Sequence, residues 1–184
     1  AYEEIDSIVV CSVGEDVEDN PIDTRAVDLG LSVKWASCNV GATSPEDCGD
    51  YFAWGETKPK KNYDWTTYKY CKGTDRTITK YCDNSSYGNN GFIDNKIVLE
   101  PEDDAATVNM GSEYRMPTEA EIRELIDNTT RKYIDIRGNE NYSALEGELK
   151  GVRFIGPNGN SIFIPASGVG QGSRITSMNI AGGA

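Results

Sequence analysis

The first residues in this chain that suggest a chemical role are two cysteines and three acids between positions 35 and 57. The stretch reads WASCNVGATSPEDCGDYFAWGET and contains Cys38, Cys48, Glu46, Asp47 and Asp50. Carboxylate oxygens are ligands that Ca²⁺ prefers, but these acids lack the alternating spacing of a calcium-binding loop. The glycines and the Ser-Pro pair are typical of a tight turn. We therefore predict a turn in which Cys38 and Cys48 are free thiols, with a bridge between them as the alternative.

Two further cysteines, Cys71 and Cys82, end the similar phrases YKYC and TKYC. Two short segments closed by a polar turn place such residues within bridging distance, so we predict a Cys71–Cys82 disulfide. The alternative is a pair of half-buried thiols in a cytosolic protein. Since the chain has five cysteines, the fifth being Cys11, at least one thiol has no bridging partner within it.

The chain contains no histidine. Histidine is the usual general base of serine and cysteine hydrolases and the commonest zinc ligand. A zinc site would therefore require four thiolates at irregular spacings, whereas chemistry based on lysine, tyrosine or carboxylates remains available. Because histidine is also the most frequent acid or base in enzymes, we predict a protein without enzymatic activity.

Asp103 and Asp104 lie in the first turn of a predicted helix that starts at Pro101, and they are the candidate metal ligands of the chain. Acids at the start of a helix are stabilised by the helix dipole, which accounts for both residues without a metal. The alternative is a calcium site, because paired carboxylates suit this ion. We predict no other cofactor.

The three tryptophans could each offer a flat ring to the apolar face of a sugar. Trp35 and Trp54 lie in segments with alternating apolar residues, so we predict that both pack in the core. Trp65 lies in the polar, aromatic-rich phrase NYDWTTYKYC. We predict that it is exposed, and it is our candidate ligand-binding residue.

The overall charge limits the classes of partner. The chain has 184 residues and a net charge of −12, from 30 acidic and 18 basic residues. This charge repels phosphate backbones and anionic membranes, so we predict no nucleic-acid binding. No stretch approaches the about 20 apolar residues of a membrane-spanning helix, so we also predict no direct membrane insertion. The first residues include no basic leader, so an exported protein would have its signal segment absent from this chain.

These residues must be positioned by one domain, which we predict at 25–184, after an acidic segment or linker at 1–24 that could add one strand. AVDLGLSVKWAS alternates apolar and polar residues, which predicts a strand with one buried face. GDYFAWGE and NYDWTTYKYC are also predicted as strands. The apolar pieces VRFI and SIFIP flank PNGN, which predicts a hairpin.

Two helices interrupt the strands. In LEPEDDAATVNMG, Pro101 is predicted at the first helical position and Gly111 at the end. In MPTEAEIRELIDNTT, Thr118 and Glu121 form a capping box. The apolar stripe of this second helix, predicted to pack onto a sheet, consists of Ile122, Leu125 and Ile126. The fold class predicted is α+β, with antiparallel sheets and two helices packed against them.

Three phrases in order carry a resemblance to a known family: AVDLGLSVKWASCNVGATSPEDCGDYFAWGET, DNKIVLEPEDDAATVNMGSEYRMPTEAEIRELIDN and GPNGNSIFIPASG. Over roughly 26–170, the chain resembles the fibrobacter-type major paralogous domain. The resemblance implies a C-type lectin-like fold, in the branch shared with formylglycine-generating enzymes, in which calcium often binds carboxylate pairs. It also implies an exported protein of gut-type anaerobic bacteria, secreted or anchored at the outer membrane or cell surface.

The chain departs from this family in two ways. Members usually continue beyond the IPASG phrase into an aromatic, Ser-rich segment, so we expect the lectin-like domain to be incomplete at its C-terminus. The enzymatic relatives use a cysteine pair in that late region, whereas no cysteine follows Cys82. The resemblance therefore implies a non-enzymatic adhesion module that binds a glycan or a protein. The alternatives are a subunit of a surface appendage, which homo-oligomerises or is completed through an unpaired sheet edge, and, third, an enzyme of the formylglycine-generating type.

Overall fold

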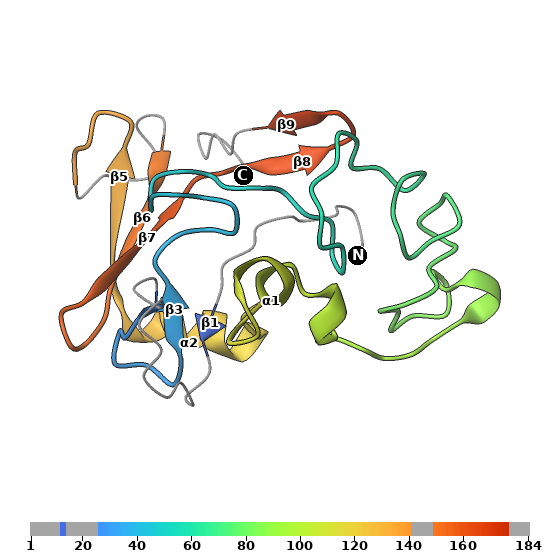
Figure 1. The fold of residues 1–184 in the computed structure, drawn as a ribbon, viewed down its shortest axis with the longest axis horizontal. Helices are drawn as coiled ribbons and strands as arrows, with labels where there is room; N and C mark the ends of the chain where they lie inside the picture. The colour runs from blue at the N-terminus through green and yellow to red at the C-terminus, as the bar shows by residue number, and fades with distance from the viewer. Residues whose placement is uncertain (1–11, 14–25, 141–148, 177–184) are drawn as a thin grey trace.

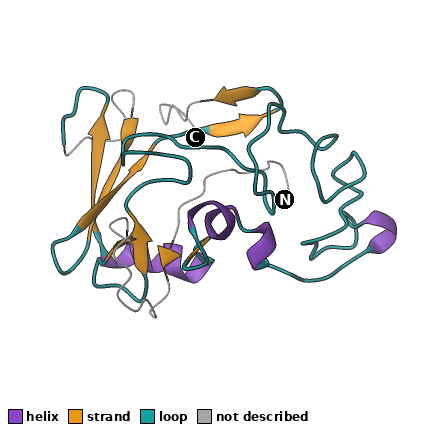
Figure 2. Cartoon of the chain, viewed as in Figure 1, coloured by secondary structure: helices purple, strands orange, loops and turns teal. Residues whose placement is uncertain are grey.

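The computed structural model describes residues 12–13, 26–140 and 149–176 of the chain. It combines small antiparallel sheets with two α-helices, which confirms the α+β class (Figures 1 and 2). Within the described residues, no helix is long and apolar enough to cross a membrane. The proposed segment at 1–24 lies outside the described residues apart from β1 (Ser12–Val13), which pairs with strands of the domain.

The first sheet has the strand order β2-β3-β1-β4. Its other members are β2 (Ala26–Val27), β3 (Lys34–Ala36) and β4 (Tyr114–Arg115). The prediction of one continuous strand here was wrong, because β2 and β3 pair as a hairpin, with Val27 opposite Trp35. The chain turns at Gly30, whose φ of 74° favours glycine and whose N–H donates to the Asp28 carboxylate at 2.7 Å.

The second sheet contains β5 (Thr130–Asp135), β6 (Leu149–Ile155) and β7 (Ser161–Pro165) in that order. The hairpin predicted from PNGN is confirmed, since β6 and β7 pair with Ile155 opposite Ser161. A third, two-stranded sheet contains β8 (Val169–Gln171) and β9 (Arg174–Thr176). Figure 1 shows β8 and β9 running above the centre of the molecule, apart from β5 to β7.

The second predicted helix is α2 (Glu119–Asn128), and its capping box is present. The Thr118 hydroxyl accepts the N–H of Glu121 at 3.3 Å, and the Glu121 carboxylate accepts the N–H of Thr118 at 2.7 Å. The predicted apolar stripe was wrong in part. Leu125 is buried, whereas Ile122 and Ile126 are exposed.

The first predicted helix is divided into two parts. Pro101 begins a 3₁₀ turn, η2 (Pro101–Asp103), as its fixed φ favours at a helix start. The α-helix proper, α1 (Ala105–Met110), begins one residue after Asp104 and ends at Gly111 as predicted. Asp104 is the N-cap of α1, and its carboxylate accepts two N–H groups of the first turn. The prediction that placed it inside the first turn was therefore wrong by one position.

A core between the first two sheets and α2 holds the body of the molecule together. Its buried members are Leu29, Trp35, Leu125, Phe154 and Ile162. A Cβ at Gly156 would lie 2.0 Å from the carbonyl oxygen of Leu29, so the β6–β7 turn lies directly against the β2–β3 turn. The prediction of a core position is confirmed for Trp35, whereas Trp54 is only half-buried.

Most of the chain between 48 and 100 has no regular strand. The strands predicted from GDYFAWGE and NYDWTTYKYC were wrong, because both segments consist of turns and irregular backbone. Their contacts resembling a sheet are isolated bridges, such as Tyr63 with Gly172 and Cys71 with Ile78. In Figure 1, the green part of this region and the short helix η1 (Asn89–Gly91) extend to one side of the body.

Candidate functional site

The irregular segment at 51–82, here called the aromatic loop, contains the predicted ligand-binding residue Trp65 and is fixed by tyrosine hydroxyls. The Tyr63 hydroxyl donates to the carbonyl of Tyr51 at 2.6 Å. The Tyr68 hydroxyl donates to the carbonyl of Trp54 at 3.0 Å. Tyr63 and Tyr68 are buried, and burial raises the pKa of both phenols. Each tyrosine therefore supplies the donor that this backbone would find in a sheet.

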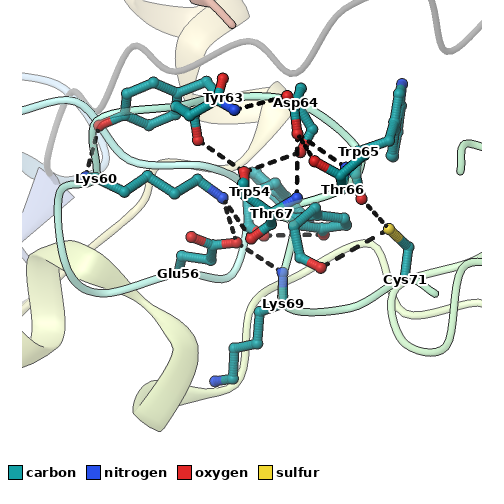
Figure 3. Close-up of polar contacts among 12 residues, drawn as sticks. Trp54, Glu56, Lys60, Tyr63, Asp64, Trp65, Thr66, Thr67, Lys69 and Cys71 are labelled. Carbon is teal, nitrogen blue, oxygen red and sulfur yellow. Dashed lines mark hydrogen bonds and ion pairs between the residues drawn. The ribbon is translucent and has the colours of Figure 1, made fainter. Parts of the chain in front are cut away.

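Charged side chains complete the framework beneath Trp65 (Figure 3). The Glu56 carboxylate accepts the ammonium of Lys60 and the N–H of Lys69, each at 2.8 Å. The Asp64 carboxylate accepts the N–H groups of Thr66 and Thr67 at 2.9 and 3.1 Å, which closes a turn around Trp65. The hydrogen bonds from Thr66 lower the pKa of Asp64 and keep this carboxylate ionised.

Trp65 lies at one end of a row of four aromatic rings. Its ring meets that of Tyr68 edge to face, with centroids 5.8 Å apart. The row continues to Tyr70 and Tyr81 with the same geometry, at 6.1 and 5.6 Å. Figure 3 shows the indole of Trp65 extending away from the polar contacts of the loop. Trp65 is half-buried, so the prediction of an exposed residue was wrong, although the residue is not fully enclosed.

The other end of the row surrounds Asp103, whose side chain is only 3% exposed. Its carboxylate accepts the ammonium groups of Lys69 at 2.9 Å and Lys80 at 2.5 Å. It also accepts the hydroxyl of Tyr81 at 2.9 Å and the hydroxyl of Tyr70. Burial alone would raise the pKa of Asp103, but these four donors outweigh burial and hold the pKa well below its usual range.

The Asp103 contacts explain the repeated phrase that the sequence displays. YKYC and TKYC each contain a Lys-Tyr pair, and both pairs converge on this one carboxylate. The two lysines also lie over the ring of Tyr70, at 4.6 and 5.3 Å from its centroid. Sequence analysis missed this cluster, although the echo of the two phrases was its visible signal.

The disulfide predicted from the same echo is not formed. Cys71 and Cys82 are free thiols in the structure. The Cys71 thiol donates to the carbonyl of Trp65 at 2.8 Å, and the Cys82 thiol donates to the carbonyl of Asn84 at 3.2 Å. Each sulfur is thus directed to its own local turn and not to the other cysteine.

The two carboxylates considered for calcium have separate structural partners. Asp103 binds two ammonium groups, so a cation there would have to displace them. Asp104 accepts the N–H groups of Ala106 at 2.9 Å and of Met116 at 2.8 Å, one on each oxygen. Within the described residues, no three acids or cysteines are grouped so that they could hold a metal ion.

The opening stretch forms the turn that its composition predicts. Gly41 has a φ of 80°, and the N–H of Asp50 donates to the carbonyl of Val40 at 2.8 Å. Cys38 is a buried free thiol and Cys48 an exposed one. The Asp47 carboxylate accepts the hydroxyl of Thr43 at 3.0 Å, and hydrogen bonds from Thr43 lower its pKa. These contacts serve the turn itself.

Comparisons with known proteins give no relative from which a role could be transferred. No protein-family description, curated protein or solved structure matches the chain. A role for the chain must therefore be inferred from the geometry of the aromatic loop.

Proposed function

We propose that this chain is a non-enzymatic binding module that presents Trp65 on a braced loop to a glycan at a bacterial cell surface. Its framework would be C-type lectin-like, as the three sequence phrases imply. The observation that carries the proposal is the way the aromatic loop is built. A long segment without regular secondary structure is fixed by side-chain hydrogen bonds, and a half-buried tryptophan at its edge extends away from them.

The loop geometry favours binding because the loop is already ordered in the free protein and loses little conformational entropy when a ligand binds. Immobilising a loop on binding reduces affinity, whereas a loop fixed beforehand loses little freedom. Here the contacts of Asp64, Tyr63 and Tyr68 fix the backbone on both sides of Trp65. A flat aromatic ring covers the apolar face of a hexose, and its N–H offers a donor at the edge. The indole N–H of Trp65 makes no hydrogen bond to another described residue.

The charged residues of the loop support a structural role over catalysis. The carboxyl with the most strongly lowered pKa, Asp103, is ionised and enclosed by four donors. Lys80 has a raised pKa, chiefly through its hydrogen bond to Asp103, and so remains a cation. A general base must accept a proton and a lysine nucleophile must lose one, and these contacts oppose both steps.

A test of this function compares Trp65→Ala with Phe92→Ala on an array of glycans. Phe92 is a suitable control because it is an aromatic residue that is 37% exposed and lies outside the aromatic loop. We expect the wild type and Phe92→Ala to bind the same glycans and Trp65→Ala to lose them, with unchanged circular dichroism. Equal binding by all three proteins would show that Trp65 is not a contact residue. Absence of any glycan ligand for the folded wild type would contradict the function itself.

One observation favours the assembly alternative. β7 ends the sheet order β5-β6-β7, and its outer edge pairs with no other strand within the described residues. It carries the apolar run Ile162–Ile164 without a charged residue, whereas the opposite edge strand β5 carries Arg131 and Lys132. Charges on an edge prevent pairing with another chain, so β7 is the edge that could accept a partner strand. Light scattering after size exclusion distinguishes the two functions, because a monomer at all concentrations contradicts strand exchange between copies.

A further inference from the structure

We infer that the glycan is an anionic polysaccharide, whose sulfate or carboxylate groups pair with Lys61 and Lys72 on either side of Trp65. This inference rests on the proposed function, since it specifies the ligand of the same site. It depends on three observations: the charge of the segment around Trp65, the lack of partners for these two lysines among the described residues, and the hydrogen bonds that join the residue next to each lysine to the turn carrying Trp65.

The segment around Trp65 has a charge opposite to that of the whole chain. Seven of the 18 basic residues lie between positions 58 and 80, a span that contains only two acids, Asp64 and Asp75. The remainder of the chain is therefore even more acidic than the net charge of −12 indicates. A basic segment on an acidic protein favours a ligand with negative groups at this place and not elsewhere.

The lysines of the loop fall into two groups. Lys60, Lys69 and Lys80 pair with carboxylates of the chain and brace the fold. Lys58, Lys61 and Lys72 are exposed, and none of their ammonium groups makes an ion pair or hydrogen bond to another described residue. Of these three, Lys61 and Lys72 are the ones whose neighbouring residues contact the turn that carries Trp65. Their charges are left to solvent, where a ligand can reach them.

Local hydrogen bonds place both lysines beside the turn that carries Trp65. On one side, the carbonyl of Asn62, the residue after Lys61, accepts the hydroxyl of Thr67 at 2.7 Å. On the other side, the residue before Lys72 is Cys71, whose thiol donates to the carbonyl of Trp65 at 2.8 Å. The chain next to each lysine is thus joined to the Asp64–Thr67 turn that carries Trp65.

The acidic body does not cancel this local attraction. At physiological ionic strength, charges more than about 8 Å apart in solvent are largely screened. Cations that touch the ligand therefore act on it fully, whereas acids farther away act weakly. Lysine presents a compact charge that suits a sulfate or carboxylate, and the aromatic ring supplies contact with the sugar.

The experiment measures binding of the full chain to heparin, polygalacturonate and neutral dextran by surface plasmon resonance. We expect at least one anionic polymer to bind about tenfold more tightly than dextran. The double variant Lys61→Gln/Lys72→Gln should weaken that binding roughly fivefold or more, since each surface ion pair contributes modestly. Added salt should weaken the wild type more than the double variant. The matched control is Lys34→Gln, because Lys34 is an exposed lysine on β3 of the body, and it should bind as the wild type does.

The outcomes separate this inference from the function on which it rests. Equal binding of dextran and the anionic polymers, abolished by Trp65→Ala, would overturn the inference and retain the proposed function. Failure of every glycan to bind would overturn both. Single-stranded DNA is the fourth probe, and binding as tight as that of the best polysaccharide would overturn the assignment of a sugar ligand.

Discussion

Replacing Asp103 with asparagine removes one negative charge from the buried end of the aromatic row and leaves the shape of the side chain almost unchanged. The wild-type carboxylate accepts four donors, from Lys69, Lys80, Tyr70 and Tyr81. An asparagine offers one acceptor oxygen and turns an NH₂ group toward the remaining donors. The variant therefore loses hydrogen bonds and also leaves two ammonium groups without their counter-charge.

The expected loss of stability follows from burial. Removing one partner of a buried ion pair costs about 3–5 kcal/mol, and a hydrogen bond to a charged group contributes about 1.5–3 kcal/mol. Asp103 is only 3% exposed, but Lys69 is 53% exposed, so solvent screens its share. We therefore expect Asp103→Asn to lower the free energy of unfolding by about 3 kcal/mol at pH 7, near the lower end for a buried pair.

The contribution of Asp103 to stability should depend on pH. The folded-state pKa of Asp103 is lowered, so its contribution is present above the ordinary pKa of about 4 and is lost as the pH falls below it. The difference between wild type and Asp103→Asn should be full at pH 7 and should narrow below about pH 4. Denaturant unfolding followed by tryptophan fluorescence measures both quantities.

The control for Asp103→Asn is Glu119→Gln, which breaks the surface pair of Glu119 with Arg123, whose side chains are 79% and 71% exposed. This variant should unfold at the same denaturant concentration as the wild type. A loss below about 1 kcal/mol for Asp103→Asn at pH 7, or a loss unchanged at acidic pH, would refute the assignment of a buried, ionised carboxylate.

Four further predictions test other parts of the structure. Gly156→Ala should destabilise by about 3 kcal/mol, because its Cβ would lie 2.0 Å from a backbone carbonyl oxygen, whereas Gly159→Ala, with φ of 87° and open space, should cost about 1 kcal/mol; thermal melts that rank them in reverse would contradict the packing. Hydrogen bonds from Arg115 lower the pKa of Glu121 to about 2. The wild type should therefore be more stable than Glu121→Gln at pH 7, and this difference in the free energy of unfolding should decrease as the pH falls below about 4. Acid titration of the stability of both proteins measures the difference. Intact mass under non-reducing conditions, with alkylation and peptide mapping, should find Cys71 and Cys82 unlinked, and a linked peptide would restore the disulfide. Calcium in place of a chelator should leave the melting temperature unchanged, because the carboxylates before α1 have protein partners, and a rise would restore the calcium site.

The elements that the sequence predicted correctly depend on short-range signals. The capping box of α2 joins residues three positions apart, and the β6–β7 hairpin is specified by the four residues of its turn. The prediction of strands in the aromatic loop was wrong for the opposite reason, because its contacts are long-range. Its aromatic and threonine residues have high strand propensity, but tyrosine hydroxyls satisfy the backbone from a distance of 12 or 14 residues. The aspartate that closes the Asx turn at Asp64 was one local signal that this segment turns.

The candidate site was less predictable than the elements, because its contacts join distant parts of the chain. Trp65 was proposed as a binding residue only from the composition of the phrase that contains it. Lys80 and Asp103, which lie 23 positions apart, form a pair that no local pattern indicates. The repeated Lys-Tyr pair could be seen in the sequence. Because a cysteine ends both phrases, however, the repeat was interpreted as a disulfide. The structure assigns the echo to the lysines and tyrosines.

The contacts of Asp103 bear directly on how Trp65 is presented. Asp103 fixes Tyr70 and Tyr81 through their hydroxyls, the ring of Tyr70 fixes that of Tyr68, and the ring of Tyr68 contacts Trp65. Each ring contact contributes only about 0.5–1.5 kcal/mol, so the anchor at Asp103 adds to the hydrogen bonds of Tyr63, Tyr68 and Asp64 that also fix the loop. A segment without a sheet ladder depends on such contacts for its order, since local stability follows local contacts. The buried carboxylate would thus serve the exposed tryptophan without touching a ligand, through the conformation that it imposes on the aromatic loop.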